Sequence, residues 1–301
     1  VGVLIVFFLV WLRSRIASDT STPGWRMRLR PGRWLAGVGD PELLVIGCFL
    51  FVFYLLQVHG GRVGNDGTML YVNVRSLVMD GDFDLTNEFR NFVPEKFHVK
   101  SIMEAGDKPQ PGTEVGASFL WAPFFVITHL LVTLGRAFGS TIPADGYSYP
   151  YINAVCLGSL IWGFTGVVLS YRIARRYFDP MLVACSAVVL WLASTLLWYT
   201  VQEPAMSHAT SMLAVALFVT SWLAARSSPS LVRWLGVALA AGLMISIQRY
   251  NVFYLVAPAA TLLGGFREYI SSKTAREWVQ VLKTGAIALA VFALASAPLW
   301  I

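Results

Sequence analysis

The chain has 301 residues, of which 56% are hydrophobic and 13% are charged, and its formal net charge is +6. A soluble domain would carry roughly twice this charged fraction. The composition therefore excludes a cytosolic enzyme, a secreted disulfide-stabilised protein and a disordered chain, and it predicts a polytopic membrane protein.

Apolar segments follow one another along the chain, and all but the first are long enough to cross a bilayer. They cover residues 1–12, 42–58, 117–135, 151–171, 181–200, 207–225, 231–248, 250–265 and 284–301. No alternating pattern typical of a membrane β-barrel is visible. The predicted fold class is therefore all-α, a transmembrane helical bundle with about eight or nine hydrophobic segments.

This pattern divides the chain into three regions. Residues 1–41 contain the first apolar segment and a basic loop, and residues 42–265 form the transmembrane core. Residues 266–301 contain a predicted basic interfacial helix, up to about residue 283, and a final apolar segment. The chain starts at Val1 and ends inside an apolar segment. Either end could be a truncation of a longer protein.

Basic residues between the segments indicate the orientation in the membrane. Arginines are concentrated between the first two segments, at 172–176, and near Arg226 and Arg233, which predicts that these places are cytoplasmic. Residues 59–116, which hold nine of the 17 acidic residues, then face the outer side. If 117–135 and 151–171 each cross once, 172–176 lies outside. The sequence leaves open whether 117–135 is re-entrant or the positive-inside rule is broken there.

The acidic outer loop contains one predicted helix. Leu70, Val74, Leu77 and Val78 recur at helical spacing, which predicts a short helix lying on the membrane surface. Asn65 or Asp66 could cap its start. The Asp66 carboxylate would then lie near both water and a lipid-borne substrate, although capping the helix is the commoner role of such an aspartate.

A second acidic group, Asp80-Gly81-Asp82-Phe83-Asp84, follows this helix. It lacks the glycine and the terminal glutamate of an EF-hand, so a calcium loop is not expected. For Asp80 and Asp84 we favour a solvated turn that ends the helix, whereas Asp82 is kept as a candidate for substrate binding.

Several motifs in order resemble GT-C-type membrane glycosyltransferases, in particular bacterial members of the protein mannosyltransferase and aminoarabinose transferase type. The outer loop carries Asp66-Gly67, Tyr71, Arg75-Ser76-Leu77, Asp80-Gly81-Asp82 and Asn87-Glu88. Later segments carry Glu114-Val-Gly followed by Leu120-Trp121-Ala122-Pro123-Phe124-Phe125, then Tyr171-Arg172 with Arg175-Arg176, and Trp198-Tyr199 followed by Glu203-Pro204 and Ser207-His208. The resemblance covers most of residues 42–265.

The resemblance implies transfer of a sugar from a polyprenyl-phosphate donor to an acceptor on the outer face. The acceptor hydroxyl loses a proton as it attacks, so a positioned carboxylate serves as general base, and Asp66 matches the first-loop aspartate of the family. Arg249, between two apolar segments, could hold the leaving phosphate, or it could be an interfacial arginine that extends to the membrane surface. Further substrate-binding candidates are Glu203, His208, Asp82, Tyr71 and Glu114, although His208 could equally be a capping or core residue.

The expected partners are a lipid-linked sugar donor and membrane lipids, with other transmembrane subunits as a further option and no nucleic acid. No metal site is indicated by ligand spacing, and no cofactor is certain, but a divalent cation stays open because some relatives bind one. The expected location is the bacterial inner membrane, with residues 59–116 on the periplasmic side. The alternative function is a non-catalytic GT-C-like subunit of a larger membrane complex, which Gly67 favours because many relatives carry an acidic residue there. A transporter is not favoured, because no segment holds paired charges at midplane.

Overall fold

The computed structural model describes residues 40–64, 66–91, 115–228, 230–260 and 275–296, and every regular element within these ranges is a helix. In chain order, the helices are α2 (Pro41–His59), α3 (Asp66–Met79), α4 (Thr86–Asn91), α6 (Gly116–Ala137), α7 (Tyr149–Ala174), α8 (Pro180–Leu192), α9 (Thr195–Val201), α10 (His208–Ser227), α11 (Leu231–Ile247), the 3-10 helix η3 (Arg249–Leu255) and α13 (Ala275–Ala295). The predicted all-α class is confirmed for this part of the chain.

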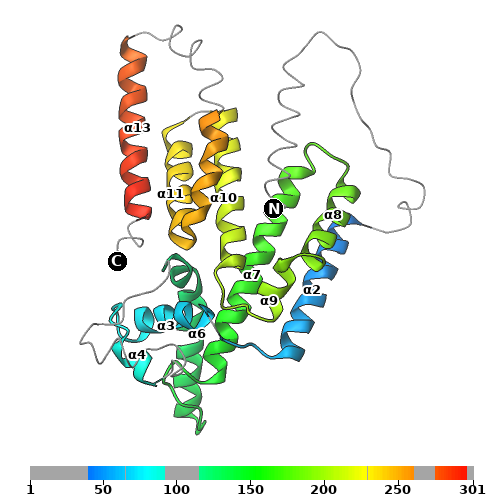
Figure 1. The fold of residues 1–301 in the computed structure, drawn as a ribbon, viewed down its shortest axis with the longest axis vertical. Helices are drawn as coiled ribbons and strands as arrows, with labels where there is room; N and C mark the ends of the chain where they lie inside the picture. Colours follow the sequence, from blue (N-terminus) through cyan, green and yellow to red (C-terminus); the bar gives the residue numbers. More distant parts are fainter. Residues whose placement is uncertain (1–39, 65, 92–114, 229, 261–274, 297–301) are drawn as a thin grey trace.

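Helices α2 and α7 run antiparallel and define the two ends of the bundle (Figure 1). Asp40 caps α2 by accepting a hydrogen bond from the Glu42 backbone at 2.8 Å, and Pro41 occupies the first turn. Glu42 pairs with Arg175, just after the end of α7. At the opposite end, the Cys156 thiol of α7 donates to the backbone carbonyl of Arg62 at 3.7 Å. The start of α2 and the end of α7 therefore lie together.

Small residues bring α7 and α10 into close contact. A Cβ atom on Gly163 would lie 3.3 Å from Ala209, and one on Gly166 would lie 2.8 Å from the backbone of Leu213. From the first pair to the second, the residue numbers increase on both helices, so α10 runs parallel to α7. Close backbone approach of this kind is how helices pack where lipid provides no hydrophobic driving force. The start of α10 consequently lies level with the middle of α7.

The predicted segment 181–200 is broken into two helices, α8 and α9, which meet at an angle of 64°. The break has a local cause. Ser194 adopts an extended conformation, and its hydroxyl accepts a hydrogen bond from the Leu196 backbone, which starts a new helix at Thr195. The Trp191 indole donates to the Thr200 hydroxyl at 3.3 Å across the bend, so the two helices are held together.

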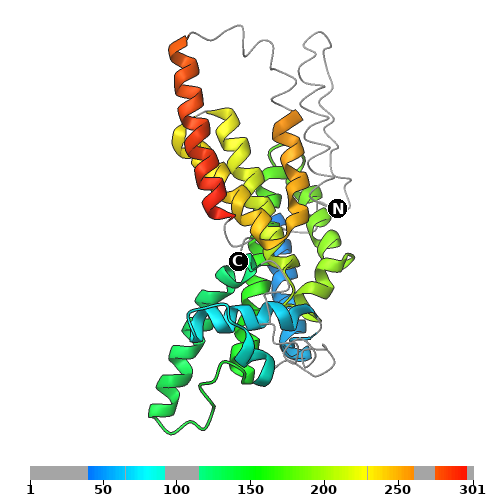
Figure 2. The ribbon, with the colours of Figure 1, turned by 60° about the vertical axis from the view of Figure 1, so that its left-hand side comes forward.

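Helix α6 packs against α7 as an antiparallel hairpin. The Trp162 indole of α7 donates to the carbonyl of Leu120 at 2.7 Å, and His129 contacts the Tyr151 hydroxyl at 2.9 Å. Helix α6 thus begins level with the middle of α7 and ends beyond its start, on the side away from Arg175. Figures 1 and 2 both show this hairpin projecting from the bundle, away from α8 and α13. Helix α6 does not reach the end of the bundle where Arg175 lies. The Glu42–Arg175 pair places residues 172–176 level with the start of α2.

Four helices in the described ranges are long and apolar enough to cross a membrane, namely α2, α6, α7 and α10, and α8 with α9 can count as a fifth span. The predicted number of eight or nine segments is not confirmed. Helix α11 and residues 283–295 are apolar but shorter, and the predicted segment 250–265 begins as the 3-10 helix η3. The predicted segment 1–12 lies outside the described residues. Of the predicted interfacial helix, residues 275–283 form the start of α13, which continues to Ala295.

Helix α3 confirms the helix predicted between Thr68 and Met79, but it is more enclosed than a surface helix with one apolar stripe. Leu70 and Val74 are buried as expected, and so are Val72, Asn73 and Ser76 on other faces. In both ribbon views α3 lies across the axes of α7 and α10, next to α6 and α4 (Figures 1 and 2). Contacts with these neighbours on several sides explain the extra burial. The spacing of apolar residues within a single helix cannot predict such contacts.

Candidate functional site

A series of contacts links the start of α3 to four other segments. Asp66 is the first residue of this helix, and its side chain is exposed. Within the described part of the chain, its carboxylate has no hydrogen-bond or ion-pair partner. The next residue, Gly67, is buried against Ala205, because a Cβ atom there would lie 3.4 Å from the Ala205 methyl group. Position 67 therefore faces a wall of the protein, with which an added Cβ atom would be in ordinary van der Waals contact.

The wall consists of the turn that joins α9 to α10. The Glu203 backbone donates to the Trp198 carbonyl at 3.1 Å, and the Met206 backbone donates to the Glu203 carbonyl at 3.2 Å. These bonds fold residues 202–207 into a compact turn in which Ala205 is buried and Glu203 is half-buried. Because Gly67 touches Ala205, Asp66 and Glu203 lie on neighbouring segments of the structure.

The start of α10 is tied to the end of α11 by Gln248. The Gln248 side-chain nitrogen lies 3.0 Å from the Ser207 hydroxyl and 3.1 Å from Nδ1 of His208. The His208 ring also lies against Tyr199, with 3.8 Å between ring centroids and 34° between the ring planes. The structure therefore fixes His208 in an ordered polar setting at the same turn that contacts Gly67.

Helix η3 is attached to α10 by a second set of hydrogen bonds. The buried Asn251 amide donates to the Ser211 hydroxyl at 2.9 Å and to the Met244 carbonyl at 2.8 Å. Arg249, between Gln248 and this anchor, has an exposed side chain. The two anchors place the Arg249 backbone beside the start of α10, level with Glu203 and His208.

The fifth segment is the start of α6. A Cβ atom on Gly116 would lie 2.5 Å from the backbone of Ser246, so the α6 start packs directly on the last turn of α11. Glu114 lies outside the described residues, only two positions before this contact. The sequence-predicted residues Asp66, Glu203, His208 and Arg249 thus lie on segments that this series of contacts links to one another.

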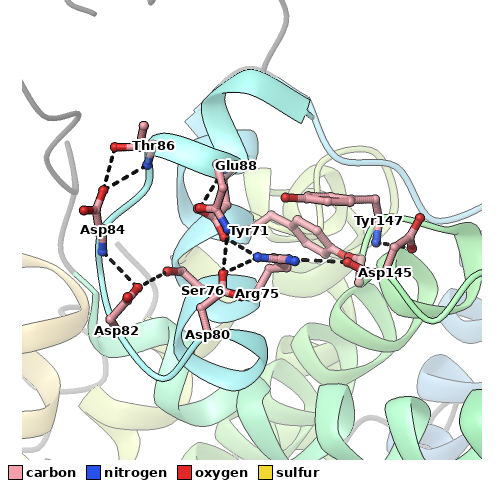
Figure 3. Close-up of polar contacts among 12 residues, drawn as sticks. Tyr71, Arg75, Ser76, Asp80, Asp82, Asp84, Thr86, Glu88, Asp145 and Tyr147 are labelled. Carbon is pink, nitrogen blue, oxygen red and sulfur yellow. Dashed lines mark hydrogen bonds and ion pairs between the residues drawn. The ribbon is translucent and has the colours of Figure 1, made fainter.

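Asp82 and Tyr71 are held in a different set of contacts (Figure 3). The Asp82 carboxylate accepts hydrogen bonds from the Ser76 hydroxyl at 3.0 Å and from the Asp84 backbone at 3.1 Å, which shapes the turn between α3 and α4. The buried Tyr71 hydroxyl donates to the Gly146 carbonyl at 2.7 Å. Burial raises the pKa of Tyr71, so its phenol stays neutral and serves as a donor to this loop. Neither contact brings these residues to Asp66.

Arg75 is the centre of this second set, and sequence reasoning gave it no role beyond its place in a motif. Its guanidinium binds Asp80 and the fully buried Glu88, the latter at 2.7 Å, and also donates to the Asp145 carbonyl at 3.4 Å. It lies over the Tyr147 ring at 4.8 Å. Figure 3 shows Arg75 between the carboxylates of Asp80 and Glu88 and the loop before α7. The sequence does contain a signal for this cluster: Arg75 and Glu88 both lie in segments with apolar neighbours. Charged side chains that are buried require partners of opposite charge, so the two residues could have been paired.

This Arg75 cluster (Arg75, Asp80, Glu88, Asp145 and Tyr147) joins three segments. Burial raises the pKa of Glu88 to about 7, although the hydrogen bond from Arg75 acts in the opposite direction. The cluster fixes α3 relative to α4 and to the α6–α7 hairpin. It therefore holds the helix whose first residue is Asp66.

Among the residues that the structure describes, no group of three or more His, Cys, Asp or Glu side chains could hold a metal ion. The arrangement instead offers an exposed carboxylate, a half-buried glutamate, an ordered imidazole and an exposed guanidinium around one turn. A carboxylate can accept a proton, and an arginine can bind a phosphate through parallel hydrogen bonds. These are the groups needed to activate a hydroxyl beside a phosphate leaving group.

The described residues form a helical bundle in which these polar side chains gather near the start of α10. The family model of dolichyl-phosphate-mannose-protein mannosyltransferases matches residues 151–300. This match, over just under half of the chain, confirms the resemblance to GT-C-type membrane glycosyltransferases. The matched residues include Glu203, His208 and Arg249, whereas Asp66 precedes them. Neither a curated protein nor a solved structure matched the chain.

Proposed function

We propose that the protein is a membrane glycosyltransferase that moves a sugar from a polyprenyl-phosphate donor to an acceptor on the outer face of the membrane. The family match supports a glycosyltransferase with a lipid-linked sugar donor in a membrane setting. The observation that carries the proposal is the contact of Gly67 with Ala205, because it brings Asp66 to the turn that holds Glu203 and His208.

In this proposal Asp66 is the general base. Its carboxylate is exposed, so it can accept the proton that the acceptor hydroxyl loses as the oxygen attacks the anomeric carbon. The bond between that carbon and the phosphate oxygen breaks, and the lipid phosphate leaves. Arg249 binds this phosphate as its negative charge increases, and Glu203 and His208 contact the substrates from the adjacent turn. Glu114, two residues before the Gly116 contact, is a further substrate-binding residue of the proposal.

The orientation is also proposed, with residues 59–116 outside and the bacterial inner membrane as the location. Arg175 at the end of α7, Arg226 at the end of α10 and Arg233 at the start of α11 lie at the end of the bundle opposite to α3. Clusters of arginine favour the cytoplasmic side. In this proposal α6 does not cross to the arginine end of the bundle, so residues 172–176 are cytoplasmic as the positive-inside rule expects.

The proposal is tested by the replacement of Asp66→Asn, which removes the base and keeps the shape of the side chain. Because general-base catalysis contributes about 10²- to 10⁴-fold, transfer should fall by at least about 100-fold. The assay uses membranes that contain the full chain, radiolabelled polyprenyl-phosphate mannose and an acceptor extract. The control is Glu42→Gln, an exposed carboxylate at the opposite end of the bundle, which should transfer at the unchanged rate. Unchanged transfer by the Asp66 variant would remove this residue from the mechanism.

A non-catalytic subunit of a larger membrane complex is the second candidate. It is supported by Gly67, because many relatives carry an acidic residue at that position, whereas the exposed apolar side chains of α6 suit contact with lipid. Purification in mild detergent should then yield stoichiometric partner chains. A monodisperse monomer that transfers sugar would rule this candidate out.

A further inference from the structure

We infer that Gln248 is a positioning residue that fixes the His208 ring so that its Nε2–H group donates a hydrogen bond to an anionic oxygen of the donor phosphate. The inference rests on the proposed function and deepens it. It assigns a role to a residue that neither the sequence motifs nor the family match identifies, and it states the chemical form of His208 that the substrate meets.

The first step concerns the proton on the imidazole. The Gln248 side-chain nitrogen lies 3.1 Å from Nδ1 of His208 and 3.0 Å from the Ser207 hydroxyl oxygen. A primary amide nitrogen only donates, so both atoms accept from it. A neutral imidazole that accepts at Nδ1 carries its proton on Nε2. His208 is therefore held as a hydrogen-bond donor through Nε2.

The second step concerns what this donor can bind. Within the described part of the chain, no acceptor for Nε2–H of His208 is found, and the side chain is only partly buried. The ring is held on one side by Tyr199, with 3.8 Å between ring centroids, so it cannot turn freely. The ionisable groups on the neighbouring segments are Glu203, Asp66 and Arg249. A neutral donor beside an arginine suits an oxygen that carries negative charge.

The third step joins Gln248 to Arg249. The two residues are consecutive, and Gln248 bonds to the start of α10 while Asn251 bonds to Ser211 of the same helix. Residues 248–251 therefore hold the His208 ring in place and also position the Arg249 backbone near the start of α10. The phosphate would receive a charged hydrogen bond from Arg249 and a neutral one from His208. Donors aimed at a developing charge lower the barrier more than they strengthen ground-state binding.

The discriminating variant is Gln248→Glu. A carboxylate only accepts, so Nδ1 of His208 must carry the proton, and the neutral ring has no hydrogen left on Nε2. At alkaline pH the kcat of this variant should fall roughly 100-fold relative to the original protein, as on loss of one donor to a developing charge. At acidic pH the imidazolium carries both protons, so the ratio of variant to original should rise as the pH falls. The matched variant Gln248→Leu should lose about tenfold at every pH, since it only loosens the ring.

The protonation of the His208 ring can also be measured by spectroscopy, without any transfer reaction. The chain contains four histidines, so nitrogen-15 NMR of the full chain labelled at histidine, with His208→Gln to identify the signals, is tractable. The original protein should show an unprotonated Nδ1, and Gln248→Glu should show a protonated one. Addition of a short-chain polyprenyl phosphate should shift the Nε2 resonance.

These outcomes separate the inference from the proposed function. A protonated Nδ1 in the original protein, an Nε2 resonance that polyprenyl phosphate does not move, or a pH-independent activity ratio for Gln248→Glu would each overturn the inference. If the NMR results are as expected but the protein transfers no sugar, the Gln248–His208 pair is still supported as a phosphate-binding pair. Only the proposed transfer reaction is then overturned.

Discussion

Individual residues in this protein acquire their properties from the segments that surround them. Glu88 is fully buried, and its only positive partner is Arg75, at 2.7 Å, among the residues for which the structure gives contacts. Burial outweighs this contact and raises the pKa of Glu88 to about 7. One of its carboxylate oxygens, Oε2, has no hydrogen-bond partner. A buried carboxylate that is incompletely paired costs free energy when it ionises.

This predicts a pH dependence of stability with a defined sign. The folded-state pKa of Glu88 lies above the ordinary value, so the folded protein binds more protons between about pH 4.5 and 7, and stability should fall as the pH rises through this window. Glu88→Gln keeps an acceptor for Arg75 and should remove this loss, which is worth on the order of 1–3 kcal/mol. The measurement is the melting temperature in detergent at about pH 5 and about pH 8.

The control for this measurement is Glu42→Gln. Its carboxylate is exposed, so the melting temperature of that variant should follow the original protein across the same pH range. An equal loss of melting temperature at high pH in Glu88→Gln and the original protein would show that Glu88 is not the titrating group.

At the scale of helices, the position of the site depends on close backbone contacts between elements. The start of α6 rests on the last turn of α11, because Gly116 has no side chain to separate the two backbones. The last turn of α11 leads directly to Gln248 and Arg249. A small displacement at this contact should therefore move two site residues that are distant in sequence from residue 116.

Gly116→Ala tests this dependence. Its Cβ atom would lie 2.5 Å from the Ser246 backbone, so the two helices must separate. Overpacking of this kind costs about 1–3 kcal/mol, and misplacement of Arg249 should lower transfer by about 100-fold. The measurements are the melting temperature and the transfer rate.

Gly47→Ala is the matched control for this change. No atom lies within 4 Å of the added methyl group, and α2 should gain about 0.5–1 kcal/mol from the better helix former. Equal melting temperatures and rates for the two variants would show that the α6–α11 contact does not position the site.

At the scale of the whole molecule, the charged residues are distributed between two ends. The end of α7 and the α10–α11 turn, which carry arginines, lie at one end, and α3, α4 and the α6–α7 hairpin lie toward the other (Figure 1). The short turn between α10 and α11 is closed by Arg233, whose guanidinium donates to the carbonyl of Ser228 at 2.8 Å. This separation is what a fixed orientation in the membrane requires.

Cysteine labelling tests the orientation. In a Cys185→Ser background the remaining cysteines, Cys48 and Cys156, are buried. Thr141→Cys, in the exposed loop after α6, should react with a membrane-impermeant maleimide in intact cells, whereas Ser227→Cys, at the end of α10, should react only after permeabilisation. Labelling of both from the outside, or the reverse order, would contradict the proposed topology.

The sequence by itself predicted the all-helical class, the helix between Thr68 and Met79 and the resemblance to the matched family. Apolar length, helical spacing and arginine bias are local properties, so composition and periodicity report them directly. The contact of Gly67 with Ala205, the break at Ser194, the bonds of Gln248 and the burial of Glu88 were decided only by the tertiary structure. Each depends on which distant segment occupies the neighbouring space, and no local pattern encodes that. The same reason explains why Asp82 and Tyr71, which the motifs grouped with Asp66, are held in contacts of their own.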